Sequence, residues 1–293
     1  MFEVNNLTRQ FGEHVAVDHV SFTVESGPVT GFVGGNGAGK TTTMRMMMGI
    51  LAPHGGEVRW HGSPVTAADR RRFGYMPEER GLYPKQKVLD QLVYLGRLHG
   101  MTTRAARGSA QEHLERFGLL DRSGDKLESL SLGNQQRVQV TAAVMTDPIA
   151  LVLDEPFSGL DPAAVDSMAD VLRQHAARGA PVLFSSHQLD LVEQLCDRLV
   201  VLSAGRVVAD GAVEELRRRG RSRHLLVLGG DAGWVRGVPG VHAVDVDGPT
   251  ALVELLAADA GQRLLKEALE RGDVREFTEQ VPSLSAIYRE VAA

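Results

Sequence analysis

A glycine-rich stretch carries the clearest chemical signature in the sequence. Its residues, in order, are Gly34, Gly35, Asn36, Gly37, Ala38, Gly39, Lys40, Thr41 and Thr42. They fit the pattern G-x-x-x-x-G-K-[ST], in which a loop turns backbone N–H groups inward around phosphate oxygens. Lys40 would bring a positive charge to the β- and γ-phosphates, and Thr41 would offer a hydroxyl ligand to Mg²⁺. Residues 29–33 favour a buried strand before the loop and 42–49 a helix after it, so we predict a nucleoside triphosphate site.

Two adjacent carboxylates form the second chemical group. Asp154 and Glu155 follow an apolar run at 149–153, which predicts a parallel strand buried on both faces. Ligands bind at the carboxyl ends of such strands. We therefore expect Asp154 to complete the Mg²⁺ shell and Glu155 to polarise the water that attacks the γ-phosphate. His187 follows a further apolar strand at 181–184, so we expect a titratable donor at the same edge, within reach of the γ-phosphate.

The third candidate is the start of a helix at 131–145. Ser131 is the expected N-cap of this helix. The backbone N–H groups of Leu132, Gly133 and Asn134 would then be free to receive an anion. A capped helix start usually has no ligand. The place of this one between the phosphate loop and the carboxylate pair favours a ligand here.

Phe11 is an isolated aromatic residue beside Gly12, 29 residues before Lys40. One interpretation is a hydrophobic residue that seals the edge of a sheet. The other is a platform for a nucleobase, because every base offers a π-face to an aromatic ring. The residues alone do not decide between the two.

Composition narrows the class of protein. The chain has 293 residues, 43% hydrophobic and 24% charged, as in a soluble protein of one large or two modest domains. A formal net charge of −5 gives no electrostatic reason to expect nucleic acid as a partner. The single cysteine, Cys196, cannot form an internal disulfide. The sequence shows neither a membrane-spanning apolar run nor a secretory signal, so we expect a cytoplasmic protein that meets membranes only through a partner.

The remaining patterns predict the elements around these motifs. Alternating apolar residues at 2–4 and 15–24 predict an antiparallel sheet, and the leucine spacing over 88–120 predicts a helical insertion. An arginine-rich stretch at 217–223 marks a change of composition; it could attract anionic lipid, but we interpret it as a solvated linker. Beyond it we predict strands at 224–228, 241–246, 251–255 and 274–278, and helices at 262–271 and 284–291. This second part is expected to be a small α+β domain without a cluster of catalytic residues.

Taken in order, the motifs resemble those of an ABC-type ATPase. They are the phosphate loop, the helical insertion, an S-x-G-x-Q-Q-R segment from Ser131, the carboxylate pair, a Ser-Gly-Leu-Asp turn ending at Asp161, and His187. The resemblance covers residues 1 to about 216. It implies an α/β fold with a RecA-like parallel sheet core, an antiparallel β-subdomain and a helical subdomain at about 85–145.

The end of the chain carries a second resemblance. Residues 282–288, Pro-Ser-Leu-Ser-Ala-Ile-Tyr, are similar to the end of an accessory domain found in a prokaryotic branch related to drug- and sodium-export ATPases. We therefore expect three regions: the ATPase domain at 1–216, the linker at 217–223, and the accessory α+β domain at 224–293.

The resemblance also implies roles for residues whose types alone were ambiguous. In this family two copies face each other head to tail and hold ATP between them. Ser131 and the Gly133 N–H would close on the γ-phosphate of the ATP held by the opposite subunit. Asp161 would connect the two sites, His187 would contact the γ-phosphate, and Phe11 would stack on adenine. A single copy of each motif implies a two-fold homodimer.

Three departures from the family pattern bear on these roles. Gly35 replaces a usual proline, and we expect a slightly looser loop. Leu132 and Asn134 replace a common glycine and glutamine, but the backbone donors remain. Glu78 stands where the family usually has a glutamine that reaches Mg²⁺ and the attacking water. A carboxylate there still offers Mg²⁺ an oxygen, and it adds negative charge near the triphosphate.

The resemblance implies the ATPase subunit of an ABC transporter, held on the inner face of the cell membrane by a separate permease. The C-terminal resemblance favours export, and import stays open. Closure of the dimer would reach that permease through residues 78–84. Two other interpretations stay open from the sequence: a soluble ABC ATPase that acts on nucleic acid or ribosomes, and a regulatory protein that uses ATP only as a dimerisation switch. The acidic balance and the single nucleotide domain oppose the first, and Glu155 with His187 opposes the second.

Overall fold

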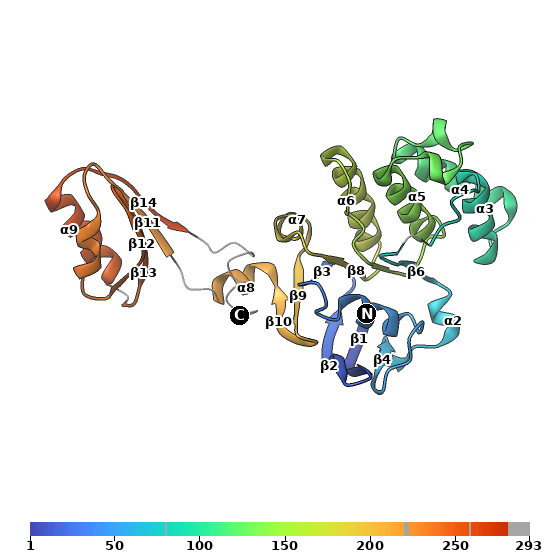
Figure 1. The fold of residues 1–293 in the computed structure, drawn as a ribbon, viewed down its shortest axis with the longest axis horizontal. Helices are drawn as coiled ribbons and strands as arrows, with labels where there is room; N and C mark the ends of the chain where they lie inside the picture. Colours follow the sequence, from blue (N-terminus) through green and yellow to red (C-terminus); the bar gives the residue numbers. More distant parts are fainter. Residues whose placement is uncertain (80, 220–222, 258, 281–293) are drawn as a thin grey trace. The chain divides into compact units, whose positions relative to one another are not determined.

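The computed structural model describes residues 1–79, 81–219, 223–257 and 259–280. These residues divide into two compact units, the first Met1–Ala212 and the second beginning at Val213 (Figure 1). Within the described ranges no helix is both long and apolar enough to cross a membrane.

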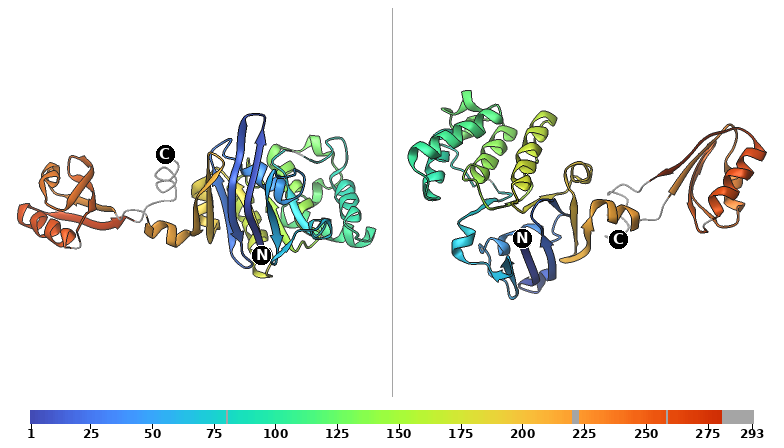
Figure 2. Two further views of the ribbon diagram at one scale, coloured as in Figure 1. Left: turned by 90° about the horizontal axis from the view of Figure 1, so that it is seen from below. Right: turned by 180° about the vertical axis from the view of Figure 1, so that it is seen from behind.

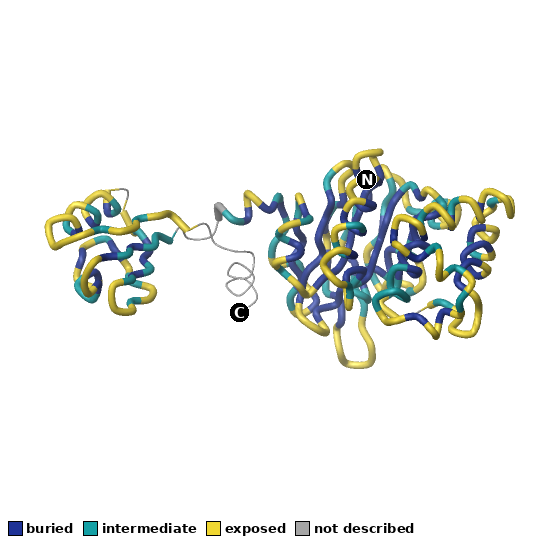
Figure 3. Tube along the Cα trace, turned by 90° about the horizontal axis from the view of Figure 1, so that it is seen from above, coloured by how far each residue is buried: buried dark blue, intermediate teal, exposed yellow. Residues whose placement is uncertain are grey.

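A six-stranded sheet forms the centre of the first unit, in the order β10-β9-β3-β8-β7-β6. Its strands are β3 Val29–Gly34, β6 Phe73–Met76, β7 Ala150–Leu153, β8 Val182–Ser186, β9 Arg198–Ser203 and β10 Arg206–Ala212. All neighbours pair in parallel except β9 and β10. Every residue of β3, β7 and β8 is buried, which explains why these segments are apolar without alternation (Figure 3).

A second, antiparallel sheet of the order β2-β1-β4-β5 packs against the first through a shared core. Its strands are β1 Phe2–Phe11, β2 His14–Val24, β4 Gly55–Trp60 and β5 Ser63–Pro64. The ring of Phe2 lies 4.8 Å from that of Phe73, and Phe22 lies 5.1 Å from Phe32, so aromatic contacts join the two sheets. β1 extends beyond the predicted residues 2–4 and ends at Phe11.

Helices surround the sheets of the first unit. They are α1 Lys40–Met47, α2 Ala67–Arg70, α3 Val88–Leu98, α4 Thr103–Arg116, α5 Leu132–Val144, α6 Pro162–Ala177 and α7 Leu189–Leu195, with short 3₁₀ turns at Leu120–Arg122 and Leu127–Ser129. Helices α3, α4 and α5 stay together in both views of Figure 2 and enclose a core of their own around Leu92, Leu114 and Val138. This is the expected helical insertion.

The second unit has its own sheet and core. The sheet order is β12-β13-β11-β14, all antiparallel. Its elements are α8 Val213–Arg219, β11 Arg223–Leu228, a 3₁₀ turn at Gly233–Gly237, β12 Val241–Asp247, β13 Thr250–Leu255, α9 Ala260–Arg271 and β14 Val274–Gln280. The core includes Leu226, Val253 and Leu264, all fully buried. The helix predicted at 284–291 lies outside the described residues.

The arginine-rich stretch differs from the expectation. Arg217–Arg219 belong to α8, whereas we expected a linker at 217–223. The helix includes Leu216, which is buried, and Glu214, whose carboxylate accepts from the Arg217 guanidinium at 3.2 Å. Glu, Leu and Arg are good helix formers, and acidic residues suit a first turn. The two compact units accordingly separate at 212/213, and the helix begins the second unit.

Candidate functional site

A cleft of about 710 Å³ lies at the carboxyl edge of the parallel sheet. Its residues come from the segments that follow β3, β6, β7 and β8, together with the end of β1, the start of β2 and the first turns of α5. The cleft brings together most of the predicted site residues: Phe11, Gly35, Asn36, Gly37, Ala38, Gly39, Lys40, Thr41, Thr42, Glu78, Leu132, Asp154, Glu155 and His187. Gly34, Ser131, Gly133, Asn134 and Asp161 do not line it.

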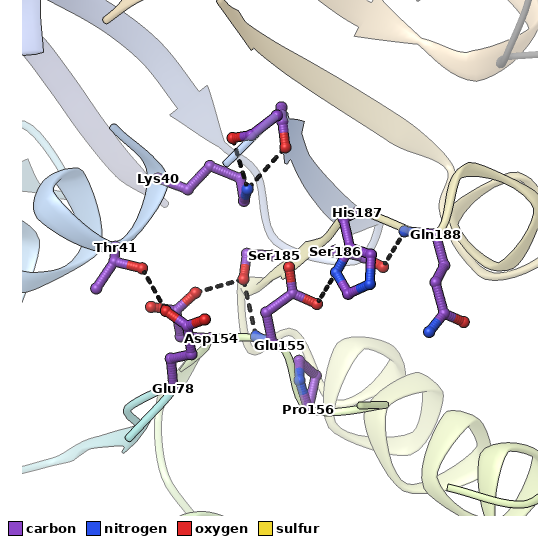
Figure 4. Close-up of polar contacts among 12 residues, drawn as sticks. Lys40, Thr41, Glu78, Asp154, Glu155, Pro156, Ser185, Ser186, His187 and Gln188 are labelled. Carbon is purple, nitrogen blue, oxygen red and sulfur yellow. Dashed lines mark hydrogen bonds and ion pairs between the residues drawn. The ribbon is translucent and has the colours of Figure 1, made fainter. Parts of the chain in front are cut away.

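The phosphate loop joins β3 to α1. Gly39, the N-cap of α1, has φ +102°, and a Cβ there would lie 2.5 Å from the Ala16 carbonyl oxygen, so only glycine fits. The helix begins at Lys40, two residues before the predicted start. The buried Lys40 amine donates hydrogen bonds to the carbonyl oxygens of Gly34 at 2.7 Å and Gly35 at 3.3 Å (Figure 4). The free N–H groups at the start of α1 point into a site suited to anions.

Ser185 holds the carboxylate pair at the end of β7. Its Oγ donates to Asp154 Oδ1 at 2.5 Å and accepts from the Glu155 backbone N–H at 2.8 Å (Figure 4). Asp154 is fully buried, and its Oδ2 has no hydrogen-bond partner among the described residues. The sequence offered no reason to select Ser185, because a serine at the end of a strand serves many roles.

Glu155 faces the cleft from a strained backbone position. Its φ is +51°, in the left-handed region that non-glycine residues rarely adopt. Gln136 Nε2 donates to the Glu155 carbonyl oxygen at 2.9 Å and the Pro156 carbonyl oxygen at 3.2 Å, which fixes this turn against α5. The side-chain carboxylate lies 3.0 Å from Nδ1 of His187, which is half-exposed (Figure 4). Gln136 lies in the S-x-G-x-Q-Q-R segment, but sequence reasoning assigned no role to its side chain.

Glu78 and Thr41 meet at the other side of the buried aspartate. Thr41 Oγ1 donates to Glu78 Oε2 at 3.2 Å (Figure 4). Burial and then the Asp154 charge raise the pKa of the neighbouring Tyr75 phenol. Hydroxyl and carboxylate oxygens are the donors that hard divalent cations prefer, so Thr41, Glu78 and Asp154 fit such an ion.

The start of α5 has the expected cap. Ser131 Oγ accepts from the Asn134 N–H at 3.4 Å, as predicted for an N-cap. A Cβ on Gly133 would lie 2.8 Å from the Gly159 carbonyl oxygen, so this glycine permits close packing of two segments. Leu132 is 60% exposed and borders the cleft.

Asp161 serves as the N-cap of α6, outside the cleft of its own chain. Its Oδ1 accepts from the Ala164 N–H at 2.9 Å, and its Oδ2 pairs with the Arg137 guanidinium at 2.6 Å. These contacts fix the turn at 158–161 against α5.

Comparison with known proteins identifies the family. A model described as ABC transporter matches residues 17–158, and one described as ATP-binding protein DrrA1-3-like, C-terminal domain, matches residues 211–292. The uncharacterized ABC transporter ATP-binding protein YhaQ of Bacillus subtilis is 38% identical over 291 residues, which cover 99% of this chain and 98% of that protein. The chain belongs to the ABC transporter ATP-binding proteins.

Other relatives carry more specific names. The Nod factor export ATP-binding protein I of Burkholderia lata is 38% identical over 217 residues, covering 73% of this chain and 71% of that protein. The linearmycin resistance ATP-binding protein LnrL of Bacillus subtilis is 33% identical over 234 residues, covering 79% and 73%. These relatives do not favour a nucleic-acid ATPase or a regulatory switch.

Solved structures confirm the fold. One titled as the structure of the ATP binding subunit of an ABC transporter has a TM-score of 0.69 and 30% identity, covering 75% of this chain and 92% of that chain. A dimeric bacterial ABC transporter cassette has a TM-score of 0.67 at 22% identity, covering 73% and 99%, and supports the fold alone. The ABC-type fold and ATP-binding predictions are therefore confirmed, and the protein is an ATPase of this family.

Proposed function

We propose that this ABC ATPase hydrolyses ATP in the cleft with a Mg²⁺ ion held by Thr41, Asp154 and Glu78. The observation that carries this proposal is the fully buried Asp154, whose Oδ2 lacks a hydrogen-bond partner among the described residues. An ionised oxygen buried without a partner is costly, so its position calls for a cation. When bound, the ion would offset negative charge on the β- and γ-phosphates.

The nucleotide would lie along the loop from Gly34 to Thr42. Backbone N–H groups would donate to the phosphate oxygens, and Lys40 would leave the Gly34 and Gly35 carbonyl oxygens for the β- and γ-phosphates. Phe11, 47% exposed at the rim, would stack on the adenine ring. The Arg9 guanidinium, 4.9 Å from the centroid of this ring on one side, leaves room for a base only on the other side.

Glu155 would orient the attacking water. Its carboxylate borders the cleft, and its contact with His187 at 3.0 Å fixes the side chain that would accept the water proton. His187 would contact the γ-phosphate from the same edge. The carboxylate must be unprotonated to act as a base, so the neutral amide of glutamine would fail in this role.

The second copy of the chain would complete each site. Ser131, Gly133 and Asn134 lie at the capped start of α5 but, unlike Leu132, do not line the cleft of their own chain. In a head-to-tail dimer the N–H groups there would meet the γ-phosphate of the opposite subunit, and Asp161 would connect the two sites through Arg137.

Transport would follow from attachment to a separate integral membrane permease at the inner face of the membrane. Relatives named for Nod factor export and linearmycin resistance favour an exporter, and so does the DrrA1-3-like match at residues 211–292. Residues 78–84, excluding the undescribed position 80, leave the cleft toward α3 and would relay closure to the permease.

Two measurements test this proposal. Purified protein should hydrolyse ATP with Mg²⁺ and stop when the ion is chelated; full turnover in chelator would refute the metal role. Tagged protein should also copurify with a stoichiometric polytopic membrane protein from detergent-solubilised native membranes. A ribosomal or DNA complex with no membrane component would refute the transport role and leave the ATPase activity standing.

A further inference from the structure

Thr41, Glu78 and Asp154 form the corner of the cleft at which we propose that Mg²⁺ binds. This corner contains two carboxylates, and a glutamine at position 78 would leave only one. Asp154 and Glu78 both line the cleft, and Thr41 Oγ1 lies 3.2 Å from Glu78 Oε2. Two of the three oxygens that suit a cation are thus already neighbours. Asp154 contributes the third, the unpartnered Oδ2.

The described cations near this corner are engaged elsewhere. The Lys40 amine donates to the carbonyl oxygens of Gly34 and Gly35. The Arg45 guanidinium pairs with Glu79 Oε1 at 3.1 Å, one residue beyond Glu78. No ion pair joins a described basic residue to Asp154 or Glu78. With both carboxylates ionised, the corner therefore carries two negative charges that these contacts leave uncompensated.

We infer that this protein binds one divalent cation in the cleft before nucleotide arrives, and that Glu78 is the residue that makes this possible. The inference rests on the proposed metal role of Thr41, Asp154 and Glu78, and adds an order of binding to it. A glutamine at position 78 would offer the ion an oxygen without a negative charge. A site with glutamine there would therefore depend on the phosphate oxygens of the nucleotide to hold the ion. The charge count of the ligands, together with the rigidity of the site, tunes cation affinity in carboxylate sites.

Asp154 is fully buried, so its charge is screened less than a charge on an open surface, whereas Glu78 is exposed. A cation bound by Glu78 and Asp154 compensates both without waiting for the triphosphate. The bound ion then presents a positive charge to arriving phosphates, so cation and nucleotide bind in sequence.

Direct measurement of Mn²⁺ binding without nucleotide tests the inference. Mn²⁺ shares the preference of Mg²⁺ for carboxylate and hydroxyl oxygens, and its free concentration can be read by electron paramagnetic resonance. Wild-type protein should bind one Mn²⁺ per chain, and excess Mg²⁺ should displace it. Glu78→Gln should weaken binding at least about tenfold, because it removes one of two charges.

Two variants sharpen the result. Glu79→Gln is the matched control, because it makes the same chemical change one residue away. The Glu79 carboxylate pairs with Arg45 and is 84% exposed, so this variant should bind Mn²⁺ like the wild type. Asp154→Asn should lose nucleotide-free binding, with circular dichroism to confirm that it folds. With a non-hydrolysable ATP analogue, Glu78→Gln should regain Mn²⁺ through the phosphates.

Each contrary outcome is informative. Wild-type protein that takes up Mn²⁺ only with the analogue would overturn the order of binding and leave the proposed metal role intact. An equal loss in Glu79→Gln would also overturn it, because general surface charge would then explain the binding. Protein that binds no Mn²⁺ even with the analogue would remove the proposed metal site itself.

Discussion

The two edges of the parallel sheet carry similar residues and differ in what those residues can do. At the carboxyl edge, His187 lies 3.0 Å from Glu155 in the cleft of about 710 Å³. At the amino edge, His175 borders two smaller cavities of about 440 and 180 Å³, together with Asp147 and Arg178. Each edge thus places a histidine and an acid beside a hollow.

The difference lies in the backbone groups that face each hollow. The N-terminus of α1 lines the cleft, and its free N–H groups attract anions. The amino-edge cavities receive the C-terminus of α6, where carbonyl oxygens face outward and the turn at 178–180 satisfies several of them. A helix N-terminus therefore faces the carboxyl-edge cleft and a helix C-terminus faces the amino-edge cavities, and we expect the histidine–acid pair to gain a catalytic role from the first setting.

The largest expected effect is on turnover at the carboxyl edge. Glu155→Gln should lower kcat by about 10²–10⁴-fold, because it removes a positioned base, while ATP binding persists. Steady-state ATPase assays with a parallel nucleotide-binding titration would measure both. Glu112→Gln is the matched change beside an amino-edge cavity and should leave kcat unchanged. Undiminished turnover in Glu155→Gln would remove Glu155 from the proton-accepting role.

The next effect is on affinity. Lys40→Ala should weaken ATP binding by about 10–100-fold, because charge-assisted hydrogen bonds to phosphate contribute roughly 1.5–3 kcal/mol. Arg116→Ala removes a positive charge beside an amino-edge cavity and should leave the affinity unchanged. A fluorescent ATP analogue titrated against each variant would measure this. Equal losses in both would mean that overall charge, rather than the phosphate loop, determines affinity.

Particular residues show what could be predicted from the sequence. Asp154 and His187 were found because buried parallel strands leave a recognisable apolar run, and whatever follows that run reaches the ligand edge. The roles of Ser185 and Gln136 were missed, although Gln136 belongs to a recognised motif, because these roles depend on contacts between residues 19 to 31 positions apart, which no local pattern records.

Two other positions show the limits of local patterns. The residue types alone left Phe11 ambiguous, and only the family resemblance assigned it to adenine; its place at the cleft rim depends on the pairing of β1 with β2. The α8 arginines were interpreted as a linker because the charge run outweighed one buried leucine, Leu216, in a short segment.

A smaller effect concerns stability at the amino edge. Burial, and next the Arg178 charge, lower the pKa of His175 from 6.5 to about 4. Between pH 4 and pH 6.5 the unfolded chain therefore binds more protons than the folded chain. The free energy of unfolding falls as the pH drops from 6.5 towards 4, and the contribution of neutral His175 is fully present above pH 6.5. His175→Gln should remove about 2 kcal/mol of this decline. Urea denaturation of both proteins at pH 7 and pH 4.5 would measure it; parallel declines would show that other groups cause the acid sensitivity.

The smallest expected effect comes from the exposed ion pair beside that histidine. Arg178 and Asp147 lie 3.4 Å apart but are 66% and 81% exposed, so Arg178→Gln should change stability at pH 7 by less than about 0.5 kcal/mol. Loss of the Arg178 guanidinium should nevertheless raise the pKa of His175, because one positive neighbour disappears and the Asp147 carboxylate is freed from its partner. An NMR titration of the His175 ring, assigned with His175→Gln, would show the shift. ATPase activity should stay at the wild-type level, since no described residue that lines these two cavities also lines the nucleotide cleft; a large loss of activity would mean that the two edges are coupled through α6.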